Sequence, residues 1–476
     1  MDNKYKFEFE LDDFQKEACE HISNGKSVVV CAPTGAGKTV IAQHAIHLAL
    51  EKGQRVFYTT PLKALSNQKY SDFATKYGIN NVGLLTGDTS INRDAQIVVM
   101  TTEVFRNMLY GTNFGSVTEN LKNVKYIVLD EVHYMNDEQR GTVWEESIIY
   151  CPTNIQLVAL SATVANAGEL TDWINTVHSQ TELVNTDFRP VPLRFYYFDS
   201  SQPSTVLPLL TPSGQLNSKI RPEKRQFHHR GKPPQRSVVR DVVRALHEKD
   251  MLPAIYFTFS RKKCDDQMEK CATSLVLVTP DEKKQIQKIV DEYLAENPYL
   301  CNNKHIEYVL NGFASHHAGL LPGWKVLVET LFKEGLIKVV FATETLAAGI
   351  NMPARSTVIS SISKRTDTGH RTLTGSEFLQ MSGRAGRRGM DEIGYVTVVG
   401  TSFQSPEEVA ELVLSDANPL MSRFSPSYSM VLNLLQRFSL DEAKELILKS
   451  FGYFSANTRL APLLHQQDRR IFFSKT

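Results

Sequence analysis

The stretch that decides the fold is Ala32-Pro33-Thr34-Gly35-Ala36-Gly37-Lys38-Thr39. It follows the apolar run Ser27 to Cys31, which predicts a buried strand, and it precedes Val40 to Leu50, which predicts a helix. Glycines in such a loop let backbone N–H groups close around phosphate oxygens, and the N-terminus of the helix adds the positive end of a dipole. The pattern therefore predicts a phosphate-binding loop in an α/β domain, although Ala32 replaces its usual first glycine.

Polar side chains near this loop predict that the bound phosphates are those of ATP, with Mg²⁺. Lys38 would reach the β- and γ-phosphates, and the Thr39 hydroxyl would ligate Mg²⁺. Asp130 would hold the same ion through its water shell, and Glu131 would accept the proton of the attacking water, which favours hydrolysis. The residues of this domain expected to bind the nucleotide are Pro33, Thr34, Gly35, Ala36, Gly37, Lys38, Thr39 and Asp130.

Short β-branched runs alternate with helical stretches along most of the chain, and this alternation predicts parallel sheets. We expect an α/β fold with two tandem P-loop-type domains, followed by a short helical C-terminal segment. The predicted strands are Ser27–Cys31, Val56–Thr60, Ile97–Met100, Tyr126–Leu129 and Leu157–Leu160 in the first domain, and Ala254–Phe257, Lys338–Phe341, Ser356–Ile359 and Tyr395–Val399 in the second.

Composition leaves nucleic-acid binding open. The 476 residues include 53 Lys plus Arg and 52 Asp plus Glu, so no global basic field marks the surface. The six cysteines contain no C-x-x-C pair and predict reduced, mostly buried thiols. The alternative is a zinc site built from Cys264, Cys271, Cys301 and the His316-His317 pair, although their spacing is irregular.

The hydropathy of the chain and its N-terminal segment predict where in the cell the protein is found. No apolar run approaches the roughly 18 residues needed to cross a bilayer, so we expect no membrane association. The segment Met1 to Leu11 is acidic and lacks the basic start and apolar core of a signal peptide. We expect a cytoplasmic protein, or one in the soluble interior of an organelle if a leader was removed.

Several motifs resemble one helicase family. Three motifs resemble those of superfamily-two DExH-box helicases: Asp130-Glu131-Val132-His133, Ser161-Ala162-Thr163 and Gln380-Met381-Ser382-Gly383-Arg384-Ala385-Gly386-Arg387-Arg388-Gly389. Four further segments resemble the superkiller branch of these helicases, which includes exosome cofactors: Phe14-Gln15, Thr60 to Leu65, Ser315 to Pro322 and Ala342 to Pro353. The motifs run in order through most of the chain, and the resemblance implies two RecA-like domains that hydrolyse ATP.

The resemblance implies the remaining catalytic residues. Arg384 and Arg387 would be arginine fingers from the second domain that stabilise the charge of the γ-phosphate during transfer. Gln380 would orient the attacking water. Hydrolysis would then remove the charge that holds the two domains together.

The resemblance also implies further nucleotide contacts. Phe14 and Gln15 would read adenine by stacking and by hydrogen bonds to its edge. For Phe14, packing of an amphipathic helix is an equally good explanation. Gly349 and Asn351 would contact the nucleotide from the second domain.

A nucleic-acid track is expected at the strand ends near the ATP loops. Phosphates of single strands are held by backbone N–H groups, hydroxyls and basic side chains. Ser161 and Thr163 would hydrogen-bond the Asp130-Glu131 loop and relay between ATP and the track. The candidate track residues are Pro61, Lys63, Thr86, Gly87, Asp88, Thr101 and Thr102 in the first domain, and Ser260, Arg261, His317, Thr343 and Thr345 in the second.

We expect four segments along the chain. Residues 1–190 form the first domain and residues 237–402 the second. Residues 191–236 form a basic, partly disordered connector, for which an accessory RNA contact is the alternative. Residues 403–476 form a helical segment that resembles the start of a winged helix. Within the second domain, Lys364 to Leu373 predicts a β-hairpin, which in the resembled branch splits the duplex.

The function expected from the resemblance is an ATP-dependent RNA helicase that moves 3′ to 5′ on single-stranded or partly duplex RNA, with RNA-decay or ribonucleoprotein partners. A DNA helicase of the same branch and an ATP-gated RNA clamp stay open, because nothing in the sequence tests for the 2′-hydroxyl. The family continues into a helical ratchet domain, whereas this sequence stops at Thr476. We therefore expect either a fragment, truncated after the start of the winged helix, or an unusually short gene product, and in both cases a chain that hydrolyses ATP but unwinds poorly.

Overall fold

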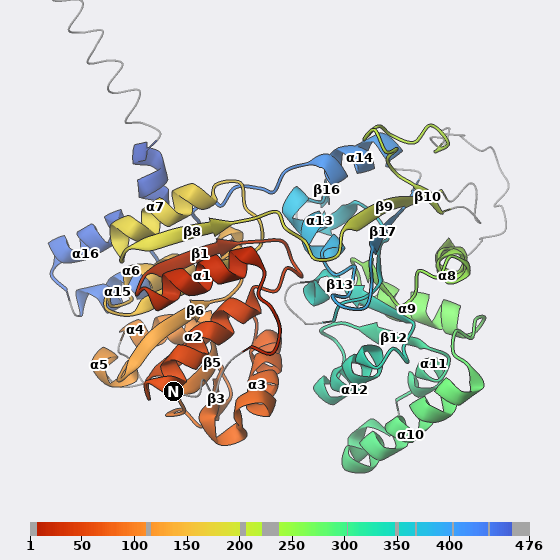
Figure 1. Ribbon diagram of the computed structural model, residues 1–476, viewed down its shortest axis with the longest axis horizontal. Coiled ribbons are helices and arrows are strands. Elements are labelled where there is room, and N and C mark those ends of the chain that lie inside the picture. The colour runs from red at the N-terminus through yellow and green to blue at the C-terminus, as the bar shows by residue number, and fades with distance from the viewer. Residues whose placement is uncertain are drawn as a thin grey trace, which may run out of the picture. The chain divides into compact units, whose positions relative to one another are not determined.

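The computed structural model describes residues 7–110, 116–199, 206–220, 238–301, 303–347, 352–366, 369–401, 404–436 and 438–458 (Figure 1). The described chain divides into two compact units. Unit 1 holds the residues up to Phe188 together with those from Asn418 onward, and unit 2 holds Arg189–Ala417. None of the described helices is long and apolar enough to cross a membrane.

Unit 1 is built on an eight-stranded sheet in the order β4-β3-β5-β2-β6-β7-β1-β8. Adjacent strands run parallel, except for the antiparallel pair of β3 and β4. The strands are β1 (Ser27–Cys31), β2 (Arg55–Thr60), β3 (Val82–Leu85), β4 (Ser90–Ile91), β5 (Ile97–Thr101), β6 (Val124–Leu129), β7 (Gln156–Ser161) and β8 (Thr181–Asn185). Five of these are the strands predicted for the first domain, since apolar runs of this length are buried on both faces.

Helices cover both faces of this sheet, as parallel crossovers require. One apolar core contains side chains of α1, α2 and α3, which Figure 1 shows on one face. A second core contains side chains of α4, α6 and α7, together with Leu420 and Phe451. The helical elements are α1 (Asp13–Ser23), α2 (Thr39–Glu51), α3 (Lys63–Tyr77), η1 (Ile79–Asn81), α4 (Thr102–Tyr110), α5 (Val117–Asn120), η2 (Val132–Asn136), α6 (Thr142–Ile149), α7 (Ala167–Val177), α15 (Tyr428–Leu435) and α16 (Leu440–Leu448).

Unit 2 is built on a seven-stranded sheet in the order β10-β9-β17-β14-β11-β13-β12, in which only the pair of β9 and β10 is antiparallel. Its strands are β9 (Leu193–Phe198), β10 (Val206–Pro208), β11 (Ala254–Thr258), β12 (Phe313–His316), β13 (Val339–Thr343), β14 (Ser356–Ile359) and β17 (Gly394–Val399). A separate antiparallel hairpin pairs β15 (Ser363–Thr366) with β16 (Gly369–Thr372), as the sequence predicted.

The helices of unit 2 again lie on two apolar cores, one with α10, α12, α13 and α14 and one with α8 and α9. The two parallel α/β units confirm the predicted fold class. The helical elements are α8 (Val238–Glu248), α9 (Arg261–Ala272), α10 (Pro280–Glu296), η3 (Pro298–Leu300), α11 (Ile306–Val309), α12 (Pro322–Lys333), η4 (Glu344–Leu346), α13 (Gly375–Ser382) and α14 (Pro406–Leu414).

The boundaries of the units differ from the predicted segments. The connector was expected from residue 191, but β9 begins at Leu193 and pairs in parallel with β17 over six residues, so this part belongs to the sheet of unit 2. Most of its basic stretch, residues 221–237, lies outside the described residues. The residues 403–476 were predicted as one helical segment, whereas α14 belongs to unit 2 and the described chain from Asn418 belongs to unit 1.

A buried carboxylate helps to hold the C-terminal segment on unit 1. Glu145 of α6 accepts hydrogen bonds from the Ser422 hydroxyl at 2.7 Å and from the Phe451 backbone N–H at 2.8 Å. Burial raises the pKa of Glu145, and these bonds oppose that rise. The Trp173 indole donates to the Lys449 carbonyl at 2.7 Å and contacts the Phe451 ring. Phe451 is thus buried in the core of unit 1.

Candidate functional site

The loop between β1 and α2 has the backbone conformation that its glycines allow. Gly35 and Gly37 have φ of 88° and 96°, a left-handed region that side chains with a Cβ rarely enter. Lys38 ends this loop, and its Nζ donates to the carbonyls of Ala32 at 2.7 Å and Pro33 at 3.1 Å. The ammonium group therefore lies over the loop, where a phosphate-binding lysine is needed.

The predicted adenine readers lie on α1, beside the same loop. The Gln15 amide donates to the Gly37 carbonyl at 3.1 Å, and its oxygen accepts from the Asp12 backbone N–H at 3.0 Å. Phe14 is buried, with its ring 6.4 Å from that of Phe188. Both side chains are thus used in packing or in supporting the loop, and their contact with adenine stays a prediction.

The carboxylate of Asp130 lies buried at the end of β6. Its Oδ2 accepts from the Tyr58 hydroxyl at 2.5 Å, and its Oδ1 accepts from the Glu131 backbone N–H at 3.0 Å. Burial and the charge of Glu131 raise the pKa of Asp130, while the ammonium groups of Lys69 and Lys38 oppose the rise. An additional positive charge would stabilise the ionised carboxylate here.

The donors around Asp130 fit Mg²⁺ with ATP. The Thr39 hydroxyl accepts a hydrogen bond from Lys69 Nζ at 3.0 Å, so two ammonium groups and two oxygen donors gather beside the glycine loop. Hydroxyl and carboxylate oxygens are ligands that Mg²⁺ prefers, with phosphate and water completing its shell. Within the described ranges, no cluster of three or more His, Cys, Asp or Glu could hold a metal ion by itself.

The cysteines agree with the prediction of reduced thiols. All six are free, and five of them are buried; only Cys301 is exposed. The zinc alternative finds no support among the described residues, because Cys264, Cys271 and His316 join no metal-binding cluster there.

Glu131 is linked to the next strand end through a histidine. Glu131 has φ 56° and ψ 49°, a left-handed conformation at the start of η2. Its Oε2 lies 3.4 Å from His133 Nδ1, and that nitrogen lies 3.3 Å from the Ala162 backbone N–H. Since an N–H must donate, Nδ1 carries no proton when it accepts from Ala162, and it then cannot donate to the Glu131 carboxylate; the two contacts are alternatives.

This geometry changes the expected relay. The hydroxyls of Ser161 and Thr163 were expected to bond the Asp130-Glu131 loop. In the part of the chain that the structure describes, neither hydroxyl does so, and the Ser161 Oγ is buried without a hydrogen-bond partner. The connection runs instead from the Ala162 backbone N–H to the His133 ring, while the Ser161 side chain is buried.

In unit 2, the arginines of the predicted catalytic motif bind backbone carbonyls or a carboxylate. Arg384 Nε donates to the Ala347 carbonyl at 3.1 Å. Arg189 donates to the carbonyls of Gly383 and Ala385 and so supports the same turn. Burial, and then the charge of Arg384, lower the pKa of Arg189 to about 10. Sequence reasoning missed Arg189, which lies far from the motif along the chain.

Arg387 forms a closed ion-pair cluster. Its Nε and Nη2 donate to the two oxygens of Asp391 at 2.8 and 2.9 Å, and its backbone N–H donates to the same carboxylate at 2.9 Å. Arg355 Nε adds a fourth bond at 3.0 Å. Burial alone would raise the pKa of Asp391, but these bonds outweigh it and lower the pKa to about 2. Asp391 was not predicted; its spacing of four residues from Arg387 was the available signal.

The other predicted contacts of unit 2 are only partly described. Gln380 lies half-buried on α13, and its orientation of a water stays a prediction. Gly349 and Asn351 lie outside the described residues.

The candidate track residues of unit 1 gather at the ends of β2, β3 and β5. Lys63 and Asp88 form an exposed ion pair, and the Thr86 hydroxyl donates to Asp88 at 3.0 Å. Gly87 between them is exposed. Thr101 ends β5, where its side chain is largely buried.

Two more of these residues make hydrogen bonds within unit 1. Thr102 is fully buried, and its hydroxyl donates to the Thr60 carbonyl at 3.1 Å, so it joins the ends of β5 and β2. The Pro61 carbonyl accepts from the Arg140 guanidinium. As nucleic-acid contacts, both residues stay predictions.

The candidates of unit 2 follow β11, β12 and β13. Ser260 caps α9 by accepting from the Lys263 backbone N–H at 3.4 Å, and Arg261 is exposed at the start of that helix. The Thr343 and Thr345 hydroxyls lie 2.8 Å apart.

His317 is held on both ring nitrogens. Nε2 lies 3.1 Å from Asp265 Oδ1, and Nδ1 accepts from the Gly319 backbone N–H at 3.1 Å. Burial would raise the pKa of Asp265, but hydrogen bonds from His317 and Ser315 lower it. Because His317 is buried and both nitrogens are engaged, its ring shapes the loop, and a contact with nucleic acid stays a prediction.

The hairpin of β15 and β16 is held by a salt-bridge cluster. Glu377 of α13 lies 2.7 Å from Lys364 Nζ and 2.7 Å from Arg371 Nη2. Burial alone would raise the pKa of Glu377, but these partners and the Thr374 backbone N–H lower it to about 2.

Comparisons with known proteins agree with these motifs. A family model described as DEAD/DEAH box helicase matches residues 12–170, and one described as Helicase conserved C-terminal domain matches residues 237–389. The chain is 44% identical to the DExH-box ATP-dependent RNA helicase DExH15, chloroplastic, of Arabidopsis thaliana, over 96% of this chain and 44% of that protein. It is 42% identical to the probable helicase HelY of Mycobacterium leprae, over 97% of this chain and 53% of that protein.

A third relative bears on the branch of the family. The chain is 39% identical to the human Superkiller complex protein 2, over 94% of this chain and 38% of that protein. The chain thus spans about half the length, or less, of these curated relatives.

Proposed function

The chain belongs to the superkiller branch of the superfamily-two DExH-box helicases, and on this premise we propose that it is an ATP-dependent RNA helicase. ATP hydrolysis drives its movement along single-stranded RNA, 3′ to 5′, and the separation of duplexes. The observation that carries the proposal is the gathering of Lys38, Thr39, Asp130 and Glu131 around one glycine loop. RNA is favoured over DNA because the Arabidopsis relative is named an RNA helicase.

The side chains of unit 1 suit hydrolysis. Lys38 exchanges two neutral carbonyls for phosphate oxygens, which are the stronger acceptors for an ammonium group. Thr39 and Asp130 would hold Mg²⁺, and the ion would supply positive charge that offsets the charge of the phosphates. Glu131 accepts the proton of the attacking water.

The side chains of unit 2 complete the reaction. Gln380 orients the attacking water, and Arg384 and Arg387 neutralise the charge that develops on the γ-phosphate. Arg387 must give up one or both of its bonds to Asp391 to do so. Gly349 and Asn351 add nucleotide contacts.

RNA is held through its phosphates rather than its bases. The exposed basic groups for this task are those of Lys63 and Arg261, and the hydroxyls are those of Thr343 and Thr345. The formal net charge of only +1 is consistent with local contacts instead of a global basic surface. Proteins of RNA decay or of ribonucleoproteins are the partners we propose, and the cytoplasm or the soluble interior of an organelle is the location.

The test is an unwinding assay on RNA, DNA and RNA–DNA hybrid duplexes, each with a 3′ or a 5′ single-stranded overhang. We expect ATP-dependent separation of duplexes whose 3′ overhang is RNA. Separation only from DNA overhangs would establish the DNA helicase alternative. ATP hydrolysis with stable RNA binding, but without separation of any duplex, would establish the clamp.

A further inference from the structure

The loop after Glu131 is attached rigidly to the next helix. Short helix η2 follows Glu131 directly, and the Asp137 carboxylate after it accepts from the Arg140 backbone N–H at 2.9 Å. The Gly141 backbone N–H donates to the Asp137 carbonyl at 2.8 Å. A Cβ on Gly141 would lie 2.2 Å from the Met135 carbonyl oxygen, so only glycine permits this approach. The position of Arg140 is therefore tied to the catalytic loop.

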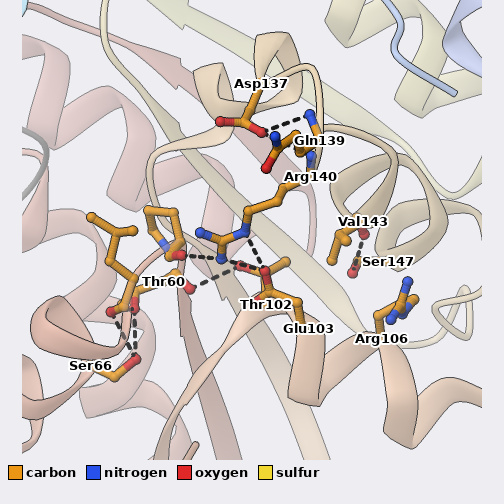
Figure 2. A network of polar contacts seen from close by, with 12 residues as sticks. Thr60, Ser66, Thr102, Glu103, Arg106, Asp137, Gln139, Arg140, Val143 and Ser147 are labelled. Atoms are coloured by element: carbon orange, nitrogen blue, oxygen red, sulfur yellow. Dashed lines mark hydrogen bonds and ion pairs between the residues drawn. The ribbon is translucent and has the colours of Figure 1, made fainter. Parts of the chain in front are cut away.

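The guanidinium of Arg140 reaches the loop before α3 and the first turn of α4 at once (Figure 2). Its Nε donates to the Glu103 carboxylate at 2.7 Å, and its Nη2 donates to that carboxylate and to the Pro61 carbonyl. The side chains of Arg140 and Glu103 are each about one-third exposed. A planar fork of donors suits this pair of acceptors, whereas an ammonium group offers no such fixed geometry.

The two groups that Arg140 contacts lie at the starts of α3 and α4, beside predicted track residues. Pro61 precedes Lys63, the first residue of α3, and Glu103 follows Thr102, the first residue of α4. The Thr102 hydroxyl donates to the Thr60 carbonyl, so the two segments also hold each other (Figure 2). One side chain thus joins the loop of the proposed catalytic base to two segments proposed to bind phosphates.

Arg140 also neutralises the negative charge of Glu103 beside the residues proposed to bind phosphates. The Glu103 carboxylate lies beside backbone that is proposed to receive phosphates, and an unpaired anion there would repel them. Arg140 neutralises that charge while it holds the start of α4.

We propose that Arg140 is the positioning residue that couples the ATP-hydrolysing loop of unit 1 to its RNA-binding segments. The inference rests on the proposed function and deepens it. Arg140 contacts neither nucleotide nor RNA in this role. It fixes the Pro61 and Glu103 segments relative to η2, so that RNA on those segments and catalysis at Glu131 depend on each other.

The experiment measures ATP turnover of the whole chain against the concentration of a single-stranded uridine homopolymer, for wild type, Arg140→Lys and Arg140→Ala. For Arg140→Ala we expect the RNA concentration at half-maximal stimulation to rise roughly tenfold or more, because charge-assisted hydrogen bonds are lost. The KM for ATP should change much less. Arg140→Lys keeps the charge but not the fork and should fall between the two.

Arg106→Ala is the matched control. Arg106 lies on α4, one turn from Glu103 (Figure 2). Its Nη1 donates to the buried Glu146 at 3.1 Å. Its loss should destabilise unit 1, yet it should leave the RNA concentration at half-maximal stimulation near that of wild type.

Equal shifts for Arg106→Ala and Arg140→Ala would make Arg140 merely structural and overturn the inference. An unchanged RNA response in both Arg140 variants would also overturn it. If wild-type turnover ignored RNA altogether, the proposed function would fail first, and the coupling would fall with it.

Discussion

The glycine loop of unit 1 and the arginine segment of unit 2, residues 384–391, serve the same proposed chemistry by different means. The loop is shaped by backbone, since Gly35 and Gly37 have positive φ and the Lys38 ammonium group donates to the carbonyls of Ala32 and Pro33. The arginine segment is shaped by side chains, since Arg387 is bound by both oxygens of Asp391. A loop shaped by its backbone can bind phosphate without a change of conformation, whereas Arg387 must first release the Asp391 carboxylate before it can bind a phosphate.

The hydrogen bonds that Lys38 and Arg387 must break to bind phosphate differ in strength. Hydrogen bonds in which the donor or the acceptor is ionised are roughly twice as strong as neutral ones. The bonds of Lys38 carry a charge on the donor alone, whereas those between Arg387 and Asp391 carry a charge on both groups and add the attraction between opposite charges. Lys38 can therefore leave its carbonyls for phosphate easily, while Arg387 leaves Asp391 only when a comparable anion replaces it. The γ-phosphate in transfer is such an anion. We infer that the arginine segment, rather than the glycine loop, decides when hydrolysis proceeds.

The largest expected effect is that of Arg387→Ala. An arginine that meets only the transition-state charge contributes about 10³-fold or more to turnover. We expect single-turnover ATP hydrolysis to fall by that order, with ATP affinity within a few fold of wild type. Equal losses of affinity and turnover would instead make Arg387 a ground-state ligand, and the contrast between the two regions would disappear.

Glu131→Gln tests the other region. The amide keeps the size of the carboxylate and loses its basicity, and removal of a positioned base costs roughly 10²- to 10⁴-fold. We expect binding of ATP to persist while turnover nearly stops. Wild-type turnover would exclude Glu131 as the base.

The smallest expected effect concerns pH and Asp391. Its pKa in the folded chain is lowered from 3.8 to about 2, so its ionised form stabilises the fold fully above pH 4 and progressively less as the pH falls toward 2. Asp391→Asn should lower the thermal midpoint at pH 6, and the difference from wild type should shrink as the pH falls toward 2.

Asp250→Asn is the control for this measurement. Asp250 also pairs with Arg355, at 2.8 Å, but its side chain is 94% exposed, and such pairs contribute little. A difference that stays constant from pH 6 to 2 would show that the ion pairs of Asp391 do not stabilise unit 2.

Much of this architecture was predictable because buried parallel strands are apolar on both faces. Such runs located β1, β2, β5, β6 and β7, and the glycine pattern located the phosphate loop. Strand β9 was missed because it is only half-buried over most of its length, so its sequence lacks that signal.

The partners of side chains were far less predictable. Gln15 and Lys38 were assigned from motifs, but their bonds to loop carbonyls depend on tertiary distances. Arg189 and Arg140 lie far along the chain from the groups they bind, and no local pattern marks a side chain that supports a distant turn.

The central claim is that RNA and ATP turnover are coupled in this chain. Steady-state ATP hydrolysis with and without single-stranded RNA, at low salt, tests it most directly, since phosphate contacts weaken as salt rises. If RNA binding and ATP turnover are coupled, RNA raises turnover in wild type and added salt removes the increase. Turnover that is the same with and without RNA at low salt would contradict it.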